Sequence, residues 1–189
     1  MPAMERHASL AAALPAQVSG VVSWTRDDDT HREVRELANE IARDHRVPLT
    51  LYALDAYTPL ADPLPNDTWS AEGAQSEFGD PLSVDDLERL GREQLAGQVL
   101  AASRSGVEAG AWIPAKGGVE TMVAYALDHG ANVVLLPSSI QDAGPLQRLQ
   151  GVSLGAAAEA DTETPVHLLL VAVDGTVTRA DRARAEARS

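Results

Sequence analysis

The 189-residue chain carries 15 Lys and Arg against 28 Asp and Glu, a formal net charge of −13, and it has no cysteine. Its hydrophobic content of 44% excludes a wholly disordered chain, and one domain with a real core is the simplest organisation. The acidic balance argues against nucleic acid as a partner. The missing thiols exclude disulfides and thiolate metal sites and fit a cytoplasmic protein. No apolar run approaches the length of a membrane span.

Strand and helix patterns alternate along the chain. Short runs rich in Val and Leu predict strands at 17–24, 49–57, 108–114, 132–137 and 166–173. Apolar residues at helical spacing predict helices at about 30–46, 83–105, 119–129 and 145–160. Asp27 to Thr30 suit an N-cap, Ser83 and Asp86 have the spacing of a capping box, and Gly130 suits a left-handed C-cap.

Three segments fall outside this alternation. Residues 1–16 are predicted to form an N-terminal tail and residues 174–189 a solvated C-terminal tail, so the domain runs from 17 to 173. Residues 58–81 hold four of the chain's 11 prolines and are predicted to form a long loop. Right-handed crossovers turn the alternation into an α/β fold, a three-layer α/β/α sandwich around a five-stranded parallel sheet.

The C-terminal half contains several features in a familiar order. These are Gly117 after the third strand, the helix end at 126–130, the apolar strand 132–136, and Pro165 with Val166 before the last strand. In this order they resemble the universal stress protein family, part of the adenine nucleotide alpha-hydrolase-like superfamily. The resemblance covers about residues 17–173, and it implies a Rossmann-like sheet with strand order 3-2-1-4-5.

In a sheet of that order, ligands bind where the strand order reverses, at the carboxyl ends of the first and fourth strands. Trp24, Thr25 and Arg26 follow the first strand, and Ser138 and Ser139 follow the fourth. The turn that contains Lys116 and Gly117 is expected to border the same edge.

The resemblance implies a nucleotide motif that this chain keeps only in part. ATP-binding members have an Asp at the end of the first strand and the pattern Gly-x2-Gly-x9-Gly-Ser/Thr after the fourth. The glycines allow backbone N–H groups to approach phosphates closely. Anchored on Gly151, the pattern places Ser138 and Gln141 at the earlier glycine positions and Val152 at the hydroxyl position, one residue before Ser153.

The expected acid falls on Trp24 or Thr25, and neither is acidic. The phosphate cradle is therefore predicted to be degraded, and tight ATP binding in the family's manner is not expected, although ATP or another adenine nucleotide stays a candidate ligand. The candidate nucleotide-binding residues are Trp24, Thr25, Arg26, Lys116, Gly117, Ser138, Ser139, Gly151 and Ser153.

Each candidate also has a purely structural explanation. Core filling is favoured over base stacking for Trp24 and Trp112, and pairing with neighbouring aspartates is favoured over a phosphate contact for Arg26. For Lys116, neutralising a bound anion and simple exposure to solvent stay equally open. The serines after the fourth strand could bind a ligand or only satisfy the turn backbone.

Capping of the following helix is favoured over cation binding for the aspartates at 27–29. The five histidines show no metal-binding spacing, and no nucleophile elbow, Walker loop or paired-carboxylate motif is evident. No catalytic residue and no metal ligand is therefore predicted.

The sequence favours a non-catalytic stress-response or regulatory protein that works as a homodimer. If the last strand lies at the edge of the sheet, its apolar edge must be covered or paired, and in the family it commonly pairs across a two-fold axis. The candidate interface residues are Val166, Leu168, Leu169, Leu170 and Val171. The alternatives are an ATP-dependent enzyme of the alpha-hydrolase-like group and an interaction module that has lost its ligand.

Overall fold

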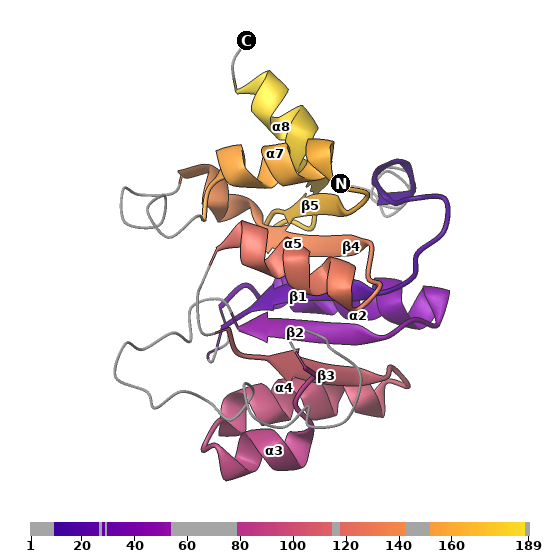
Figure 1. Ribbon diagram of the computed structural model, residues 1–189, viewed down its shortest axis with the longest axis vertical. Helices are drawn as coiled ribbons and strands as arrows, with labels where there is room; N and C mark the ends of the chain where they lie inside the picture. The colour runs from indigo at the N-terminus through magenta and orange to yellow at the C-terminus, as the bar shows by residue number, and fades with distance from the viewer. Residues whose placement is uncertain are drawn as a thin grey trace.

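A six-stranded sheet forms the middle of the protein (Figure 1). The computed structural model describes residues 10–26, 28, 30–53, 79–114, 118–142 and 152–187. Five strands run parallel, and they are β1 (Val21–Thr25), β2 (Leu49–Ala53), β3 (Ala109–Trp112), β4 (Val133–Pro137) and β5 (His167–Val171). A short β6 (Val177–Arg179) pairs antiparallel with β5, and the order is β3-β2-β1-β4-β5-β6. The predicted parallel order is confirmed, with one strand added.

Helices cover both faces of this sheet. The core on one face receives side chains from α2 (Arg32–His45), α3 (Val84–Arg89) and α4 (Glu93–Arg104). The core on the other face receives them from α5 (Val119–Asp128), α7 (Leu154–Glu163) and α8 (Ala180–Glu186). Strand residues alternate between the two cores, as Val21 and Val22 do, because successive side chains of a strand point to opposite faces. The predicted α/β/α sandwich is confirmed.

The long helix predicted at 83–105 is two helices. Gly91 has φ 70°, a left-handed conformation that glycine adopts without steric cost and that ends a helix. The predicted capping box at the start of α3 is confirmed, because Ser83 N–H donates to Asp86 Oδ2 (3.0 Å) and Asp86 N–H donates to Ser83 Oγ (3.3 Å). Gly130 has φ 67° after α5, as its predicted role requires.

Both predicted tails contribute to the packing. Residues 10–13 are helical, Ala13 is buried, and its carbonyl lies 3.1 Å from His167 Nδ1. Residues 177–186, here named the C-terminal clasp, form β6 and α8 rather than the predicted solvated tail. Val177, Ala180 and Ala183 of the clasp are buried. A three-residue strand and an alanine stripe between arginines give too weak an apolar pattern for sequence periodicity to detect.

A buried carboxylate holds the clasp against the domain. The side chain of Asp161 in α7 has no exposed surface, and it accepts hydrogen bonds from Leu168 N–H (2.9 Å), Arg179 Nη2 (2.9 Å), Arg179 Nε (3.2 Å) and Asp181 N–H (3.3 Å). A desolvated charge is tolerated only when such partners replace its water. Asp161 therefore ties together α7, β5, β6 and α8.

The clasp also corrects the expected dimer interface. β6 pairs with β5 through Leu169↔Arg179, Leu170↔Thr178 and Val171↔Val177, so this edge of β5 is already occupied. All five candidate interface residues, from Val166 to Val171, are buried within one chain. Leu169→Arg would thus disrupt the core rather than report on an interface. The predicted free edge is wrong, whereas homodimerisation itself stays a prediction.

The opposite edge of the sheet has a partner as well. Leu82 forms an antiparallel bridge with Ala111 of β3, through Leu82 N–H to the Ala111 carbonyl (2.7 Å) and Ala111 N–H to the Leu82 carbonyl (3.0 Å). A Cβ on Gly110 would lie 2.6 Å from Pro81 Cβ, so only glycine allows this close approach. Most of the predicted loop at 58–81 lies outside the described residues, and only its end is seen here. Among the described helices, none is long and apolar enough to cross a membrane.

Asp161→Ala should lower the free energy of unfolding by about 3 kcal/mol, because it leaves the partly buried Arg179 and two backbone N–H groups without their acceptor. A matched control is Glu36→Ala, which breaks the exposed pair of Arg32 Nε and Glu36 Oε1 (2.7 Å; side chains 66% and 60% exposed). The control should cost less than about 1 kcal/mol. Urea denaturation measures both, and equal losses would mean that Asp161 does not anchor the clasp.

Candidate functional site at the carboxyl edge of the sheet

The site predicted from strand order lies where β1 meets β4. These strands are neighbours in register from Val21↔Val133 to Ser23↔Leu135, so Trp24, Thr25 and Arg26 come to the same edge of the sheet as Ser138 and Ser139. The strand order of the sheet reverses between these two strands, and ligands of open α/β sheets bind at such a point. Lys116, Gly117 and Gly151 lie outside the described residues, as do Asp27 and Asp29.

Thr25 is fixed from the α4 side. It is fully buried, and its Oγ1 donates to Gln98 Oε1 (2.5 Å) and lies 3.3 Å from the carbonyl oxygen of Arg26. Gln98 Nε2 in turn donates to the carbonyls of Arg26 (2.9 Å) and Asp28 (3.0 Å). One amide side chain therefore binds the end of β1 and the segment after it. The sequence analysis missed Gln98, because a lone glutamine within a helix gives no signal.

The charged residues after β1 engage one another. Arg26 Nε lies 3.8 Å from Asp28 Oδ2, with both side chains more than 40% exposed, which agrees with the favoured pairing of Arg26. Asp28 Oδ1 accepts from Thr30 N–H (2.8 Å) and Thr30 Oγ1 (2.5 Å). These bonds to the ionised form hold the pKa of Asp28 below its usual value, with smaller contributions from Arg26 and Arg35.

The helix start differs from the predicted one. The N-cap of α2 is His31, with φ 54° and no side-chain cap, so Asp28 closes a turn with Thr30 instead of capping the helix. His31 packs its ring edge against Trp24, with centroids 6.4 Å apart. Nothing in the sequence marks His31 as the N-cap, because the preceding aspartates and Thr30 are the more common capping residues.

The β4 side of the edge is built from a turn rather than from an open glycine loop. Ser138–Asp142 form the 3-10 helix η2, and Ile140 within it is buried in the core under α5 and α7. Ser153 caps α7, because its Oγ accepts from Ala156 N–H (3.2 Å). Val152 beside it is buried. The hydroxyl of Ser153, predicted as a candidate ligand-binding group, thus caps a helix.

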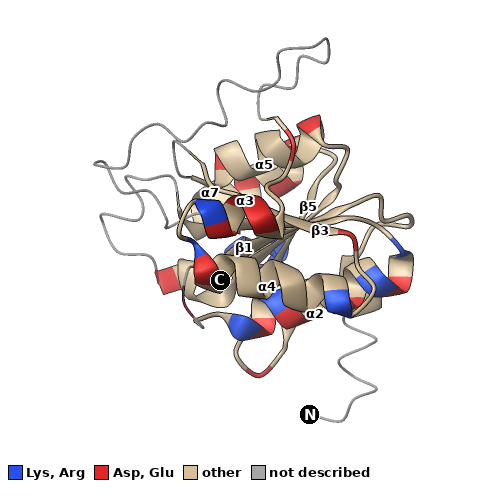
Figure 2. Cartoon of the chain, turned by 90° about the horizontal axis from the view of Figure 1, so that it is seen from below, with Lys and Arg blue, Asp and Glu red and all other residues tan. Residues whose placement is uncertain are grey.

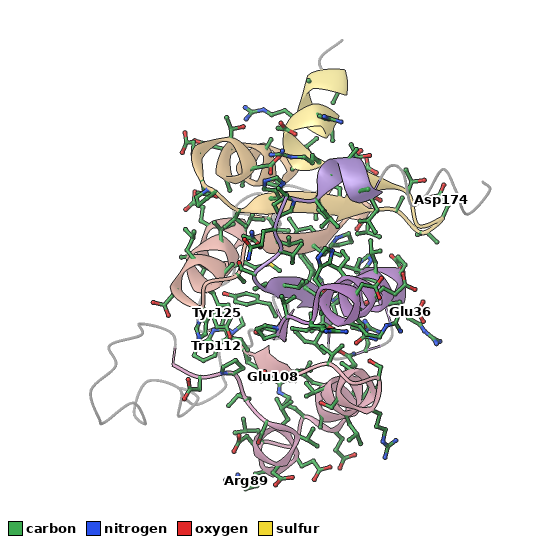
Figure 3. All side chains as sticks on the ribbon, turned by 90° about the vertical axis from the view of Figure 1, so that its right-hand side faces the viewer. Glu36, Arg89, Glu108, Trp112, Tyr125 and Asp174 are labelled. Atoms are coloured by element: carbon green, nitrogen blue, oxygen red, sulfur yellow. The ribbon has the colours of Figure 1, made fainter. Side chains whose placement is uncertain are left out.

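Aromatic side chains form a row across the carboxyl ends of three strands. Trp24 pairs in register with Tyr52, and Tyr52 with Trp112, so all three point to the α5 face of the sheet. Tyr125 of α5 packs on this row, with ring centroids 5.5 Å from Tyr52 and 5.3 Å from Trp112. Trp112 and Tyr125 lie together on this side in Figure 3, and Glu36 projects from the opposite side. Core filling by the two tryptophans is confirmed.

His129 extends the aromatic cluster toward the end of the long loop. Its ring stacks on Tyr125 (centroids 4.1 Å apart), and its Nε2 lies 2.7 Å from the carbonyl oxygen of Gly79. Tyr125 Oη lies 3.4 Å from Thr50 Oγ1. Among the described residues no group of three His, Asp or Glu could hold a metal ion. The histidine ring is thus held by stacking on Tyr125 and by two backbone carbonyls, because its Nδ1 also lies 3.0 Å from the carbonyl oxygen of Tyr125.

Two buried donors in the aromatic row have no hydrogen-bond partner among the residues that the structure describes. They are Trp24 Nε1 and Tyr52 Oη, on side chains that are 3% and 0% exposed. Their strands are neighbours, and the two residues are paired in register. An unsatisfied buried donor costs about 1–3 kcal/mol, and such groups in native proteins are commonly satisfied by water or a ligand. Sequence reasoning missed Tyr52, because its position beside Trp24 depends on strand register.

Comparison with known proteins agrees with this fold. No protein-family model matches the sequence, and no curated protein matches it. A solved universal stress protein in complex with cAMP matches with a TM-score of 0.50 and 17% identity, over 83% of this chain and 98% of that one. The universal stress protein of Archaeoglobus fulgidus in complex with dAMP gives 0.48 and 14%, over 82% and 98%. A family protein of Burkholderia pseudomallei gives 0.47 and 16%, over 84% and 98%.

The chain therefore has the universal stress protein fold, an open α/β sheet with helices on both faces. The fold expected from the resemblance is confirmed.

Burial raises the pKa of the phenols of Tyr52 and Tyr125 well above the usual 10.0. The folded protein therefore keeps both protons while the unfolded chain releases them, so stability is complete below pH 10 and falls as the pH rises above it. Denaturation at increasing pH should show this loss, and Tyr52→Phe should weaken the dependence. An unchanged slope in that variant would contradict the burial of the Tyr52 hydroxyl.

Proposed function

We propose that this chain is a non-catalytic regulatory protein of the universal stress protein type. It binds an adenine nucleotide at the carboxyl edge of β1, β2 and β4, mainly through the base and sugar and only weakly through phosphates. The fold it shares with the cAMP-bound universal stress protein supports the location and the ligand class.

The observation that carries the proposal is the pair of unpartnered donors, Trp24 Nε1 and Tyr52 Oη. They belong to residues paired in register between β1 and β2, and β1 is one of the two strands that end at the switch point, where ligands of open α/β sheets bind. Purine ring nitrogens and ribose oxygens are acceptors that suit an indole N–H and a phenol O–H. Their deep burial makes each bond to a ligand valuable, since no residue in the described part of the chain accepts from either donor.

The weak role of phosphates follows from the β4 side of the edge. A phosphate cradle needs bare backbone N–H groups at a loop or helix start. Here η2 places side chains at the two earlier glycine positions, Ser138 and Gln141, and it is anchored by the buried Ile140. Ser153 Oγ already accepts from Ala156 N–H. The net charge of −13 adds repulsion against three phosphates.

The non-catalytic role is supported by how the polar groups of this edge are used. The best-placed described carboxylate, Asp28, is held by two bonds from Thr30 and by Arg26, and Thr25 is held by Gln98. An enzyme of the alpha-hydrolase-like group needs an acid and a phosphate loop that converge on the substrate. The alternative of a ligand-free interaction module is favoured by η2, which places side chains where a phosphate would bind. Nucleotide titration distinguishes this alternative from the proposal.

Homodimerisation belongs to the proposal in a modified form. β6 occupies the edge of β5 along 169–171, so two copies would meet through helix faces or through exchange of the C-terminal clasp. In such an exchange, Asp161 of one copy would accept the same hydrogen bonds from the clasp of the other copy.

Calorimetric titration of the full chain should show binding of cAMP and AMP and weaker binding of ATP, by about tenfold or more. Added Mg²⁺ should narrow that difference by neutralising phosphate charge, without any hydrolysis product appearing. Tighter binding of ATP than of AMP would contradict the proposed weak phosphate contact. Silence with all three would support the ligand-free module instead.

Tyr52→Phe should change ligand affinity and stability in opposite directions. Without ligand the variant should be as stable as the parent or more stable by about 1 kcal/mol, because it removes a donor that has no partner. Its affinity for AMP should fall about tenfold, because the ligand loses a buried hydrogen bond. Tyr125→Phe, whose hydroxyl contacts Thr50, is the matched control and should leave AMP affinity unchanged. A stability loss in Tyr52→Phe with unchanged affinity would reject the assignment.

A further inference from the structure

A cavity of about 620 Å³ lies between α2 and α4, on the side of the sheet opposite the aromatic row. Figure 2 shows the two helices next to each other, with basic residues along α2. Its volume is in the range of about 300–1,000 Å³ that is typical of small-molecule sites. The proposed nucleotide edge does not use this cavity, so a ligand here would be a second one.

Small residues of α4 keep the cavity open. Gly97 and Ala101 lie one helical turn apart on the wall, and Leu49 and Leu51 of β2 form its apolar floor. A Cβ placed on Gly97 would meet nothing within 4 Å, so the main chain does not require glycine there. A glycine inside a helix is about 1 kcal/mol less favourable than alanine. The helix thus gives up stability at a position where a larger side chain would fill the cavity.

Polar side chains gather at the rim of this apolar floor. Arg32 and Arg35 come from α2, and Gln94 and Gln98 come from α4. Arg32 Nε binds Glu36 Oε1 at 2.7 Å, and Arg35 Nη1 donates to the carbonyl of Thr30 at 2.8 Å. The Arg32–Glu36 pair is largely exposed, so it contributes little and a carboxylate of a ligand can replace Glu36 as the partner.

The charge at the rim differs from the charge of the whole chain. Two arginines and two acids, Asp28 and Glu36, line the cavity, whereas the chain carries a net charge of −13. The rim is therefore neutral where the chain as a whole is strongly acidic. An anion is repelled less here than elsewhere, and the planar N–H donors of the two guanidinium groups match a carboxylate.

We propose that the cavity between α2 and α4 binds a small amphipathic monocarboxylate, with its apolar body on Leu49 and Leu51 and its carboxylate at Arg32 and Arg35. Gln98 lines the same cavity and binds Thr25 and the carbonyls after β1. Ligand contact with Gln98 would therefore act on the segment that leads into the nucleotide edge. The proposed carboxylate site does not depend on nucleotide binding, so an experiment can reject either proposal without rejecting the other.

The test uses the full chain, anilinonaphthalene sulfonate as a fluorescent probe with an apolar body and an anionic group, and octanoate, octanol and octylamine as competitors. The probe should bind with a stoichiometry of one. Octanoate should displace it at concentrations at least about tenfold lower than octylamine, because only the carboxylate gains charge-assisted hydrogen bonds. Equal displacement by octylamine, or several equivalent probe sites, would overturn the proposal.

Filling the cavity provides the second arm. Gly97→Leu and Ala101→Leu should each weaken probe binding at least about tenfold, since their side chains take the volume of the ligand body. Ala124→Leu, at an exposed position of α5, is the matched control and should bind as the parent does. Thermal denaturation checks that the variants are folded. Leucine favours a helix more than glycine does, so Gly97→Leu is not expected to lose binding through unfolding. Parent-like affinity in both filled variants would overturn the site.

The carboxylate contact has its own variant. Arg35→Gln should weaken octanoate about tenfold and leave octanol unchanged, because the loss is restricted to the charged head. An equal loss for both competitors would reject the arginine as the carboxylate partner.

Discussion

The double burial of the parallel sheet is the constraint on which the other features depend. A parallel sheet has both faces covered, so each strand alternates its side chains between two separate cores. In β1 this alternation sends Trp24 to the α5 side and Thr25 to the α4 side. Neighbouring residues at one strand end thereby serve different surfaces, and the aromatic row and the cavity between α2 and α4 lie back to back across the sheet.

Much of the fold could be predicted from the sequence, because long apolar runs and cap residues carry local information. The five parallel strands, the capping box at Ser83 and the glycine after α5 all follow from patterns within a few residues. The break at Gly91 and the clasp could not be predicted in this way. Gly91 is a single residue within an otherwise helical pattern, and β6 is stabilised by a carboxylate in another helix, Asp161.

The site was predictable in position but not in its decisive residues. Strand order alone placed Trp24 and Ser138 at one edge of the sheet, because the switch point depends only on topology. Tyr52 and Gln98 became visible only with coordinates, since their roles depend on strand register and on which helix face meets β1. Ser153 illustrates the reverse case, in which a plausible ligand residue turns out to cap a helix.

Segments of the chain itself pair with the outer edges of β5 and β3. β6 occupies the edge of β5, and the bridge of Leu82 to Ala111 occupies part of the edge of β3. A peptide that recognises its target by adding a strand needs free N–H and C=O groups along such a border, and at these positions the chain's own segments use them. A peptide that added a strand to β5 or along Ala111 would therefore first have to displace β6 or Leu82.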